Sequence, residues 1–269
     1  MDLPNFAIII PARYASTRYP GKPLVPLRGC DGEAKTLIQR SWECAMSVEG
    51  AKGVWVATDD ERIRDEVEGF GGRVVMTAES CTNGTERCAN AIASMGDVAD
   101  VIVNLQGDAP LSPAFVVHDL VRRLAEDRQA AMATPGVQCS RSVYRHLAED
   151  AAQGRVGGTT VVCNSAGHAL YFSKRLLPYL SASDAEREFP PVNLHLGLYA
   201  YRPEALRLYS AAPVSELEQL EGLEQLRFLN LGQKIAVVQL DSLGWDSIEL
   251  NNPSDVGVIE RILAQRGIA

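Results

Sequence analysis

The first part of the chain alternates short apolar runs with amphipathic stretches. The run over residues 5–11 (NFAIIIP) is apolar and β-branched, which is typical of a strand buried on both faces. Further elements follow in alternation, with strands predicted over residues 53–57, 73–76 and 100–105 and helices over residues 36–47, 61–70, 85–94 and 113–125. Because such alternation implies right-handed crossovers, the pattern predicts an α/β fold with a doubly wound, mostly parallel sheet.

The second part mixes short strands with short helices. Strands are predicted over residues 159–163, 169–173, 194–201 and 234–240. The acidic stretch over residues 215–229 forms one helix or two helices joined near Gly222. A last helix is predicted over residues 253–265, with Asn252 as its N-cap and Pro253 in its first position. Because no repeat, low-complexity tract or linker separates the two parts, we expect a single domain.

The composition narrows the classes of partner. The 269 residues include 26 Lys and Arg against 34 Asp and Glu, which gives a net charge of −8 and a pI near 5.1. This acidic balance argues against nucleic-acid and membrane-surface binding. The six cysteines form no CxxC pair and have no histidines at zinc spacing, and the N-terminal apolar run is too short for a signal peptide. We therefore expect a cytoplasmic protein with reduced thiols.

Positive charge is concentrated in the loop after the first strand. Arg13, Arg18 and Lys22 lie within ten residues, interleaved with Ser16 and Gly21. Ligands of doubly wound sheets lie outside the carboxyl ends of the strands, and a triphosphate needs cations together with loop N–H groups. Lys22 suits neutralising charge on the α- and β-phosphates, although the loop could also be a solvated basic turn. It contains neither GxGxxG nor GxxxxGK[ST], which disfavours a dinucleotide fold or a P-loop ATPase.

Three other groups of polar residues each have two interpretations. Asp108, in the QGDAP segment after an apolar run, is either a magnesium ligand or an Asx-type turn cap. His195 and Tyr199 are four residues apart and would share one face of a strand, although a histidine among apolar neighbours is commonly structural. The last group consists of Glu224, Gln225 and Arg227. These residues either contact a polyhydroxy acid or form the solvated face of a helix.

Several segments together resemble a known family. They lie at residues 8–24 (IIIPARYASTRYPGKPL), 56–63 (VATDDERI), 70–77 (FGGRVVMT), 83–87 (NGTER), 103–111 (VNLQGDAPL), 169–174 (ALYFSK), 195–202 (HLGLYAYR) and 223–227 (LEQLR). On these motifs the chain resembles the 3-deoxy-manno-octulosonate cytidylyltransferases, or CMP-KDO synthetases, over nearly its whole length. The resemblance implies a Rossmann-like fold of the nucleotide-diphospho-sugar transferase type and a cytoplasmic homodimer in lipopolysaccharide biosynthesis. Within residues 1–269 it implies a nucleotide-binding part, 1–135, and a sugar-acid-binding and dimerisation part, 136–269.

The resemblance also implies a reaction, in which CMP passes from CTP to the anomeric hydroxyl of KDO or a related sugar acid and pyrophosphate is released. The hydroxyl would attack the α-phosphorus in line with the leaving pyrophosphate, without a covalent enzyme intermediate. The implied catalytic residues are Lys22, Arg13, Arg18 and Asp108, with Asp108 as a Mg²⁺ ligand. The nucleotide would be bound by Ala12, Arg13, Ser16, Arg18, Lys22, Thr77, Asn83, Gly84, Arg87 and Gln106. The sugar acid would be bound by His195, Tyr199, Glu224 and Gln225.

Three positions depart from the pattern of that family. Ala109 replaces the glutamate of the usual QGDEP, Asn251 stands where a second magnesium aspartate is usual, and Thr160 replaces a lysine. Asparagine is a poorer ligand than aspartate for a hard dication, so either Asp246 or Glu249 helps to hold the metal or the acceptor has changed. The alternatives are a nucleotidyltransferase with a different acid acceptor in specialised metabolism and a catalytically silent nucleotide-binding homologue.

Overall fold

A computed structural model describes residues 3–16, 19–96, 98–241 and 249–269. The chain forms two compact units. Unit 1 comprises Met1–His118, Tyr201–Ser210 and Ser247–Ala269, and unit 2 comprises Asp119–Ala200 and Ala211–Asp246. Unit 1 therefore combines the N-terminal strands with the last segment of the chain.

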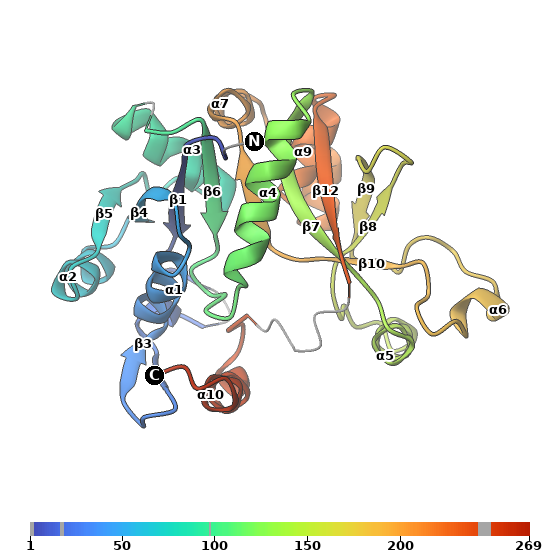
Figure 1. Ribbon diagram of the computed structural model, residues 1–269, viewed down its shortest axis with the longest axis horizontal. Coiled ribbons are helices and arrows are strands. Elements are labelled where there is room, and N and C mark those ends of the chain that lie inside the picture. Colours follow the sequence, from blue (N-terminus) through green and yellow to red (C-terminus); the bar gives the residue numbers. More distant parts are fainter. Residues whose placement is uncertain (1–2, 17–18, 97, 242–248) are drawn as a thin grey trace. The chain divides into compact units, whose positions relative to one another are not determined.

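Unit 1 contains a parallel sheet. Its strands are β1 (Phe6–Pro11), β4 (Ala51–Thr58), β5 (Arg73–Met76) and β6 (Val101–Leu105), in the spatial order β5-β4-β1-β6 (Figure 1). The connecting helices are α1 (Leu37–Met46), α2 (Glu61–Gly69) and α3 (Gly84–Met95). All of these elements were predicted from the periodicity to within a few residues. The expectation of an α/β fold with a doubly wound, mostly parallel sheet is confirmed.

The order of the strands places two loops side by side. The chain runs from β1 outward to β4 and β5, and then returns to β6 on the other side of β1. The change of direction makes the carboxyl ends of β1 and β6 neighbours, with Ile9 paired to Asn104. Such a reversal is the usual ligand position in a doubly wound sheet. The loops after β1 and β6 are the segments in which the sequence analysis placed Lys22 and Asp108.

Short polar side chains fix where the helices of unit 1 begin. Thr36 accepts a hydrogen bond from the backbone N–H of Gln39 at the start of α1, and Asn83 accepts one from Glu86 at the start of α3. Asp60 caps α2 in the same way. Each cap satisfies one of the backbone donors that the first turn of a helix leaves unpaired.

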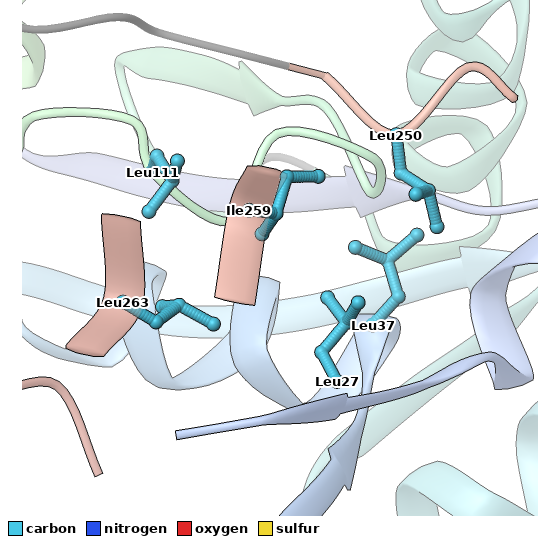
Figure 2. Close-up of a cluster of buried hydrophobic side chains, with 6 residues drawn as sticks. All are labelled: Leu27, Leu37, Leu111, Leu250, Ile259 and Leu263. Atoms are coloured by element: carbon cyan, nitrogen blue, oxygen red, sulfur yellow. The ribbon is translucent and has the colours of Figure 1, made fainter. Parts of the chain in front are cut away.

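A second group of elements in unit 1 encloses an apolar cluster. The elements are η1 (Lys22–Leu24), the antiparallel hairpin β2 (Pro26–Arg28) and β3 (Ala34–Thr36), η2 (Pro253–Asp255) and α10 (Val256–Gln265). Helix α7 (Pro203–Ala211) is a further element of unit 1 outside this cluster. The cluster consists of Leu27, Leu37, Leu111, Leu250, Ile259 and Leu263, all buried (Figure 2). It fixes the C-terminal segment against the start of α1 and the loop after β6.

The prediction of one helix over residues 253–265 is confirmed for its N-cap, Asn252, and for Pro253 in the first position, but its first turn is a separate 3-10 helix, η2. Asp255 N–H bonds to the carbonyl of Asn252 three residues earlier, and the Asp255 carboxylate accepts from the backbone N–H groups of Asn251 and Asn252. The carboxylate thereby closes a tight turn before α10 begins at Val256.

Unit 2 contains a mixed sheet. Its strands are β7 (Ala130–Gln138), β8 (Thr160–Cys163), β9 (Ala169–Ser173), β10 (Asn193–His195), β11 (Leu198–Tyr201) and β12 (Lys234–Leu240). Strand β12 runs parallel to β7, whereas the pairs β7/β10, β10/β8 and β8/β9 are antiparallel. The helices are α5 (Arg141–Ala152), α6 (Ala182–Ala185), α8 (Glu216–Glu221) and α9 (Gln225–Asn230), and α4 (Ala114–Glu126) begins in unit 1 and ends in unit 2.

Two segments of unit 2 refine the sequence analysis. The acidic stretch forms two helices, α8 and α9, because Gly222 adopts a left-handed conformation (φ 61°) and ends the first. The single strand predicted over residues 194–201 was wrong. The chain bends after His195, where Leu198 N–H donates to the carbonyl of Leu196, and the segment divides into β10 and β11. Within the described residues, no helix is long and apolar enough to cross a membrane.

Candidate functional site

An ion pair joins the loops after β1 and β6. The Nζ of Lys22 lies 2.5 Å from Oδ2 of Asp108, and both side chains are mostly buried. Gly21 directly before the lysine has a φ of 70°, which a residue without a Cβ adopts at little cost. The loop thereby turns Lys22 into η1 and towards β6.

Other residues of the first loop have local partners. Ala12 is buried, and its N–H extends β1 by donating to Ala57 of β4. Arg13 is exposed and donates to the carbonyl of Thr82, and the hydroxyl of Ser16 accepts from Tyr19 N–H. The candidate Arg18 lies outside the described residues.

An aromatic contact braces this loop against α2. The guanidinium of Arg62 lies 3.3 Å from the centre of the Tyr14 ring, and Asp60 holds the same guanidinium through two hydrogen bonds. The ring also lies close to Gly21, where a Cβ atom would be only 3.1 Å from the tyrosine. Tyr14 therefore contacts Arg62 and also lies against the residue that precedes Lys22.

The loop after β6 passes very close to the end of β1. A Cβ on Gly107 would lie 2.8 Å from the carbonyl oxygen of Pro11, so only glycine allows this approach without a shift. The hydroxyl of Ser41 holds the Gly107 carbonyl, and Ala109 N–H closes the turn on the carbonyl of Gln106. The turn keeps Asp108 beside the first loop, and the buried Ala109 leaves no carboxylate at the next position.

The C-terminal segment reaches the same place. Leu250 N–H donates to the Asp108 carbonyl at 2.9 Å, which places Asn251 next to the loop after β6. The Nδ2 of Asn251 lies 3.4 Å from a carboxylate oxygen of Glu249. The other sequence candidate for this position, Asp246, lies outside the described residues.

The oxygen atoms near this point are of the kind that a hard dication prefers. Asp108 carries a carboxylate, and Asn251 and Glu249 carry further side-chain oxygens on the neighbouring segment. The described residues contain no group of three or more His, Cys, Asp or Glu side chains placed to hold a metal by themselves. Phosphate oxygens and water would therefore have to complete the coordination of Mg²⁺.

The residues assigned to the cytidine side gather around the start of α3. Arg87 is 2% exposed, and its guanidinium bonds to the hydroxyl of Thr77 at 2.6 Å and to Asp59 at 3.0 Å. It therefore fixes the loop between β5 and α3. Asn83 donates to the hydroxyl of Tyr209 in addition to capping the helix.

Because Gly84 has no Cβ, two amide side chains can approach the first turn of α3. A Cβ at this position would lie 3.0 Å from Gln106 and 3.1 Å from Asn104. Asn104 is fully buried, and neither polar atom of its side chain has a hydrogen-bond partner among the described residues. The sequence analysis selected Gly84 and Gln106 but not Asn104, which lies inside an apolar run.

In unit 2, His195 and Tyr199 lie on different strands but remain neighbours, with ring centres 5.4 Å apart. The edge of Phe172 packs against the imidazole from β9 at 5.1 Å. The Nε2 of His195 lies 2.9 Å from the hydroxyl of Thr134 on β7. Burial lowers the pKa of His195 to about 3, so the imidazole is neutral at physiological pH.

The three candidates on α9 have different environments. Glu224 is the residue before the helix and is partly exposed, whereas Gln225 is buried and its Nε2 has no hydrogen-bond partner in the part of the chain that the structure describes. Arg227 is buried in a two-point ion pair with Glu218, both distances being 2.7 Å. It therefore supports the packing of α9 on α8, and the interpretation as a solvated helix face does not apply to it.

Thr160 has a structural role at the place where the family resemblance predicts a lysine. It is 2% exposed, and its hydroxyl donates to the carbonyl of Arg175 at 2.6 Å. The same oxygen accepts from Leu177 N–H, so the threonine ties β8 to the segment after β9.

Comparisons with known proteins establish the family of the chain. The family model described as Cytidylyltransferase matches residues 7–235. The chain belongs to the cytidylyltransferase family. A 3-deoxy-manno-octulosonate cytidylyltransferase from Maricaulis maris is 41% identical over 259 residues, which cover 96% of this chain and 97% of that protein. An 8-amino-3,8-dideoxy-manno-octulosonate cytidylyltransferase from Shewanella halifaxensis is 39% identical, with coverage of 97% and 99%.

A solved structure is similar over the whole fold of this cytidylyltransferase. It is a CMP:2-keto-3-deoxy-manno-octonic acid synthetase in complex with CTP, with a TM-score of 0.82, 34% identity and coverage of 97% of this chain and 99% of the other. The nucleotidyltransferase fold and the enzyme class expected from the motifs are therefore confirmed.

Besides Asn104, the sequence analysis missed three residues near the candidate residues of the cytidylyltransferase. They are Tyr14 with its partner Arg62, and Thr134, which bonds to His195. Tyr14 and Arg62 both lie in segments that were quoted for the family resemblance, but neither has a periodic or spacing signal that would pair them. Thr134 lies directly before Pro135 and Gly136, and because these two residues are untypical of a strand, the strand that contains Thr134 was not predicted.

Proposed function

We propose that this cytidylyltransferase transfers CMP from CTP to the anomeric hydroxyl of 3-deoxy-manno-octulosonate or a closely related sugar acid. The observation that carries the proposal is the ion pair of Lys22 and Asp108 at the neighbouring carboxyl ends of β1 and β6. It places a cation and an anion at the switch point of the sheet, where a triphosphate and its counterion bind. Full-length similarity to enzymes named for this acid supports the choice of acceptor.

The chemistry is a substitution at phosphorus. The anomeric oxygen forms a bond to the α-phosphorus, the bond from that phosphorus to the bridging oxygen of pyrophosphate breaks, and the hydroxyl proton passes to water. Lys22 neutralises charge that develops on the phosphates, and Arg13 adds a second cation from the same loop. The bracing of the loop by Tyr14 and Arg62 keeps the ammonium in place before the substrate arrives.

Asp108, with Asn251 and Glu249 beside it, would hold Mg²⁺ together with phosphate oxygens and water. Bound there, the ion would supply positive charge to the triphosphate. The side chains at the start of α3, Asn83, Gly84 and Gln106, would meet the cytidine. In unit 2, His195, Tyr199, Glu224 and Gln225 would meet the sugar acid.

We also propose that the enzyme is a cytoplasmic homodimer in lipopolysaccharide biosynthesis. Unit 2 exposes large apolar side chains, among them Leu170, Tyr179 and Leu220 at 58%, 92% and 75%. Such side chains are candidates for cover by a second copy. The six cysteines, all within the described residues, form no disulfide with one another. Light scattering on the purified protein tests the dimer, and a monomeric mass would contradict it.

The activity is tested by pyrophosphate release. We expect release with CTP and 3-deoxy-manno-octulosonate in the presence of Mg²⁺, and much less with ATP, GTP or UTP. A panel of other acids, including 8-amino-3,8-dideoxy-manno-octulosonate, tests the alternative that the acceptor has changed, which Ala109, Thr160 and Asn251 motivate. Binding of CTP without turnover of any acid would overturn the proposal and favour a silent nucleotide-binding homologue.

A further inference from the structure

The hydroxyl of Thr134 makes two hydrogen bonds with different requirements. Its Oγ1 lies 2.9 Å from Nε2 of His195 and 2.9 Å from the carbonyl oxygen of Leu198. Thr134 is fully buried on β7, and the described residues offer the hydroxyl no other partner. The two contacts therefore have to be satisfied with the single proton that a threonine hydroxyl carries.

The distribution of protons follows from the nature of the two partners. A carbonyl oxygen only accepts, so the contact to Leu198 is a hydrogen bond only if Thr134 donates its proton there. The hydroxyl oxygen must then accept from His195, and the proton of the neutral imidazole lies on Nε2. If Thr134 instead donated its proton to Nε2 of His195, no proton would lie between the hydroxyl and the buried carbonyl of Leu198, and that contact would not be a hydrogen bond.

The surroundings of the imidazole agree with a neutral ring. Phe172 packs nearly perpendicular to the imidazole, the Tyr199 ring lies tilted beside it at 5.4 Å, and no described carboxylate forms an ion pair with His195. Burial among these groups lowers the pKa of His195 to about 3. With Nε2 protonated, the unprotonated Nδ1 is a hydrogen-bond acceptor without charge.

We propose that Thr134 is a positioning residue that fixes His195 as the Nε2–H tautomer, so that its Nδ1 accepts a hydrogen bond from a hydroxyl group of the sugar acid. The second half of this inference depends on the proposed function, which gives His195 to the acid. A carboxylate has no proton to donate and would be repelled by the lone pair of Nδ1. His195 therefore selects a polyhydroxylated part of the acceptor and does not bind its carboxylate.

Nitrogen NMR tests the tautomer without reference to activity. The chain has four histidines, so a ¹⁵N-labelled sample gives few imidazole signals, and the variant His195→Gln assigns the one of interest. In the wild type we expect a protonated Nε2 and an unprotonated Nδ1 that do not change between pH 6 and 8. A proton on Nδ1, or an imidazolium in this range, would overturn the inference.

Substitution of Thr134 gives the functional readout. In Thr134→Val the imidazole loses its acceptor, and we expect the KM for 3-deoxy-manno-octulosonate to rise roughly tenfold, as for the loss of one hydrogen bond, while the KM for CTP stays unchanged. Thr134→Ser keeps the hydroxyl and should restore the wild-type KM and the tautomer. An equal rise of both KM values in Thr134→Val would contradict a role towards the acid.

The two proposals fail separately. Absence of turnover with any acid in the wild type overturns the proposed function, whereas the NMR measurement still decides the tautomer. If the wild type is active and Thr134→Val does not fold, the NMR result and the Thr134→Ser variant still decide the role of the hydroxyl. A Thr134→Ser enzyme that has the Nδ1–H tautomer but an unchanged KM for the acid would overturn the inference.

Discussion

The ammonium of Lys22 lies 2.5 Å from the carboxylate of Asp108, so a cation and an anion from two neighbouring strand ends form an ion pair. Each of the two side chains is only about one-fifth exposed, and their charges neutralise one another. A triphosphate with Mg²⁺ would offer each of them a new partner of opposite charge. The pair thus keeps both groups close to the position in which the reaction would need them.

Removing the cation should abolish most of the activity without unfolding the protein. In Lys22→Met we expect kcat to fall by a factor on the order of 10²–10³, because a donor that stabilises developing charge is lost. The ion pair itself contributes about 1 kcal/mol or less to folding, so the melting temperature should change little. Pyrophosphate release and thermal melting measure the two effects. Lys35→Met, which removes a lysine paired to Glu43 at 2.9 Å, is the matched control and should keep its activity.

A second carboxylate beside Asp108 should strengthen metal binding. We expect Asn251→Asp to bind Mg²⁺ on the order of tenfold more tightly than the wild type, because an added ligand charge raises affinity for a hard dication. Calorimetric titration with Mg²⁺ measures this directly, and the magnesium dependence of activity gives a second readout. Asn252→Asp, one residue further along, is the control. No change in either readout for Asn251→Asp would show that position 251 does not face the metal.

The contact between Arg62 and Tyr14 should matter for nucleotide binding. In Arg62→Ala we expect the KM for CTP to rise roughly two- to fivefold, because the loss of a cation–π contact frees the ring that packs against Gly21. Trypsin should also cut the loop after β1 faster in this variant. Arg64→Ala changes an arginine on the same helix that pairs with Asp65, and it should leave both measurements unchanged. Equal effects of the two substitutions would rule out a specific role for the contact.

The buried pair of Arg227 and Glu218 should be a stability element. Arg227→Met leaves the Glu218 carboxylate, 7% exposed, without its bidentate partner, and we expect a loss of about 3–5 kcal/mol in the free energy of unfolding. Urea denaturation measures it. The double substitution Arg227→Met with Glu218→Leu removes both charges and should recover a large part of the loss. If the double variant is as unstable as the single one, the unpaired charge is not the cause.

The low pKa of His195 predicts a specific dependence of stability on pH. Because the folded protein takes up this proton only near pH 3 and the unfolded chain near pH 6.5, acid favours the unfolded state. The contribution of His195 to the free energy of unfolding is therefore fully present above pH 6.5, and it declines as the pH falls from 6.5 towards 3. Relative to His195→Gln, the wild type should lose about 2 kcal/mol of unfolding free energy between pH 6.5 and 4.5. Parallel urea midpoints of the two proteins over this range would contradict the prediction.

The elements that the sequence predicted well are those in which one physical signal dominates. The strands of unit 1 are uninterrupted apolar runs, and the rule for ligands at the ends of parallel strands led directly to Lys22 and Asp108. Strand β7 was not predicted, because Pro135 and Gly136 interrupt it. The structure requires glycine there, since a Cβ at Gly136 would lie 2.9 Å from Val237 on the adjacent strand.

The remaining features depend on contacts between distant parts of the chain. Thr134 meets His195 across 61 residues, and Tyr14 meets Arg62 across a whole strand–helix–strand segment. Neither contact leaves a periodic pattern in the sequence. The separation of β10 from β11 likewise depends on a bend after His195. Because apolar residues lie on both sides of this bend, the sequence pattern gave no sign of it.

The apolar cluster of unit 1 has a consequence for the order in which a newly made chain can fold. Leu27 and Leu37 are synthesised early, but Leu250 and Leu263, which pack in the same cluster, are synthesised last. During translation the first strands can pair while this cluster is still incomplete. The backbone contact between Leu250 and Asp108 also forms only then. The loop that contains Asp108 therefore gains its contact with the C-terminal segment late in synthesis, and a chain that stops before residue 250 lacks both this contact and the packing of Leu250, Ile259 and Leu263.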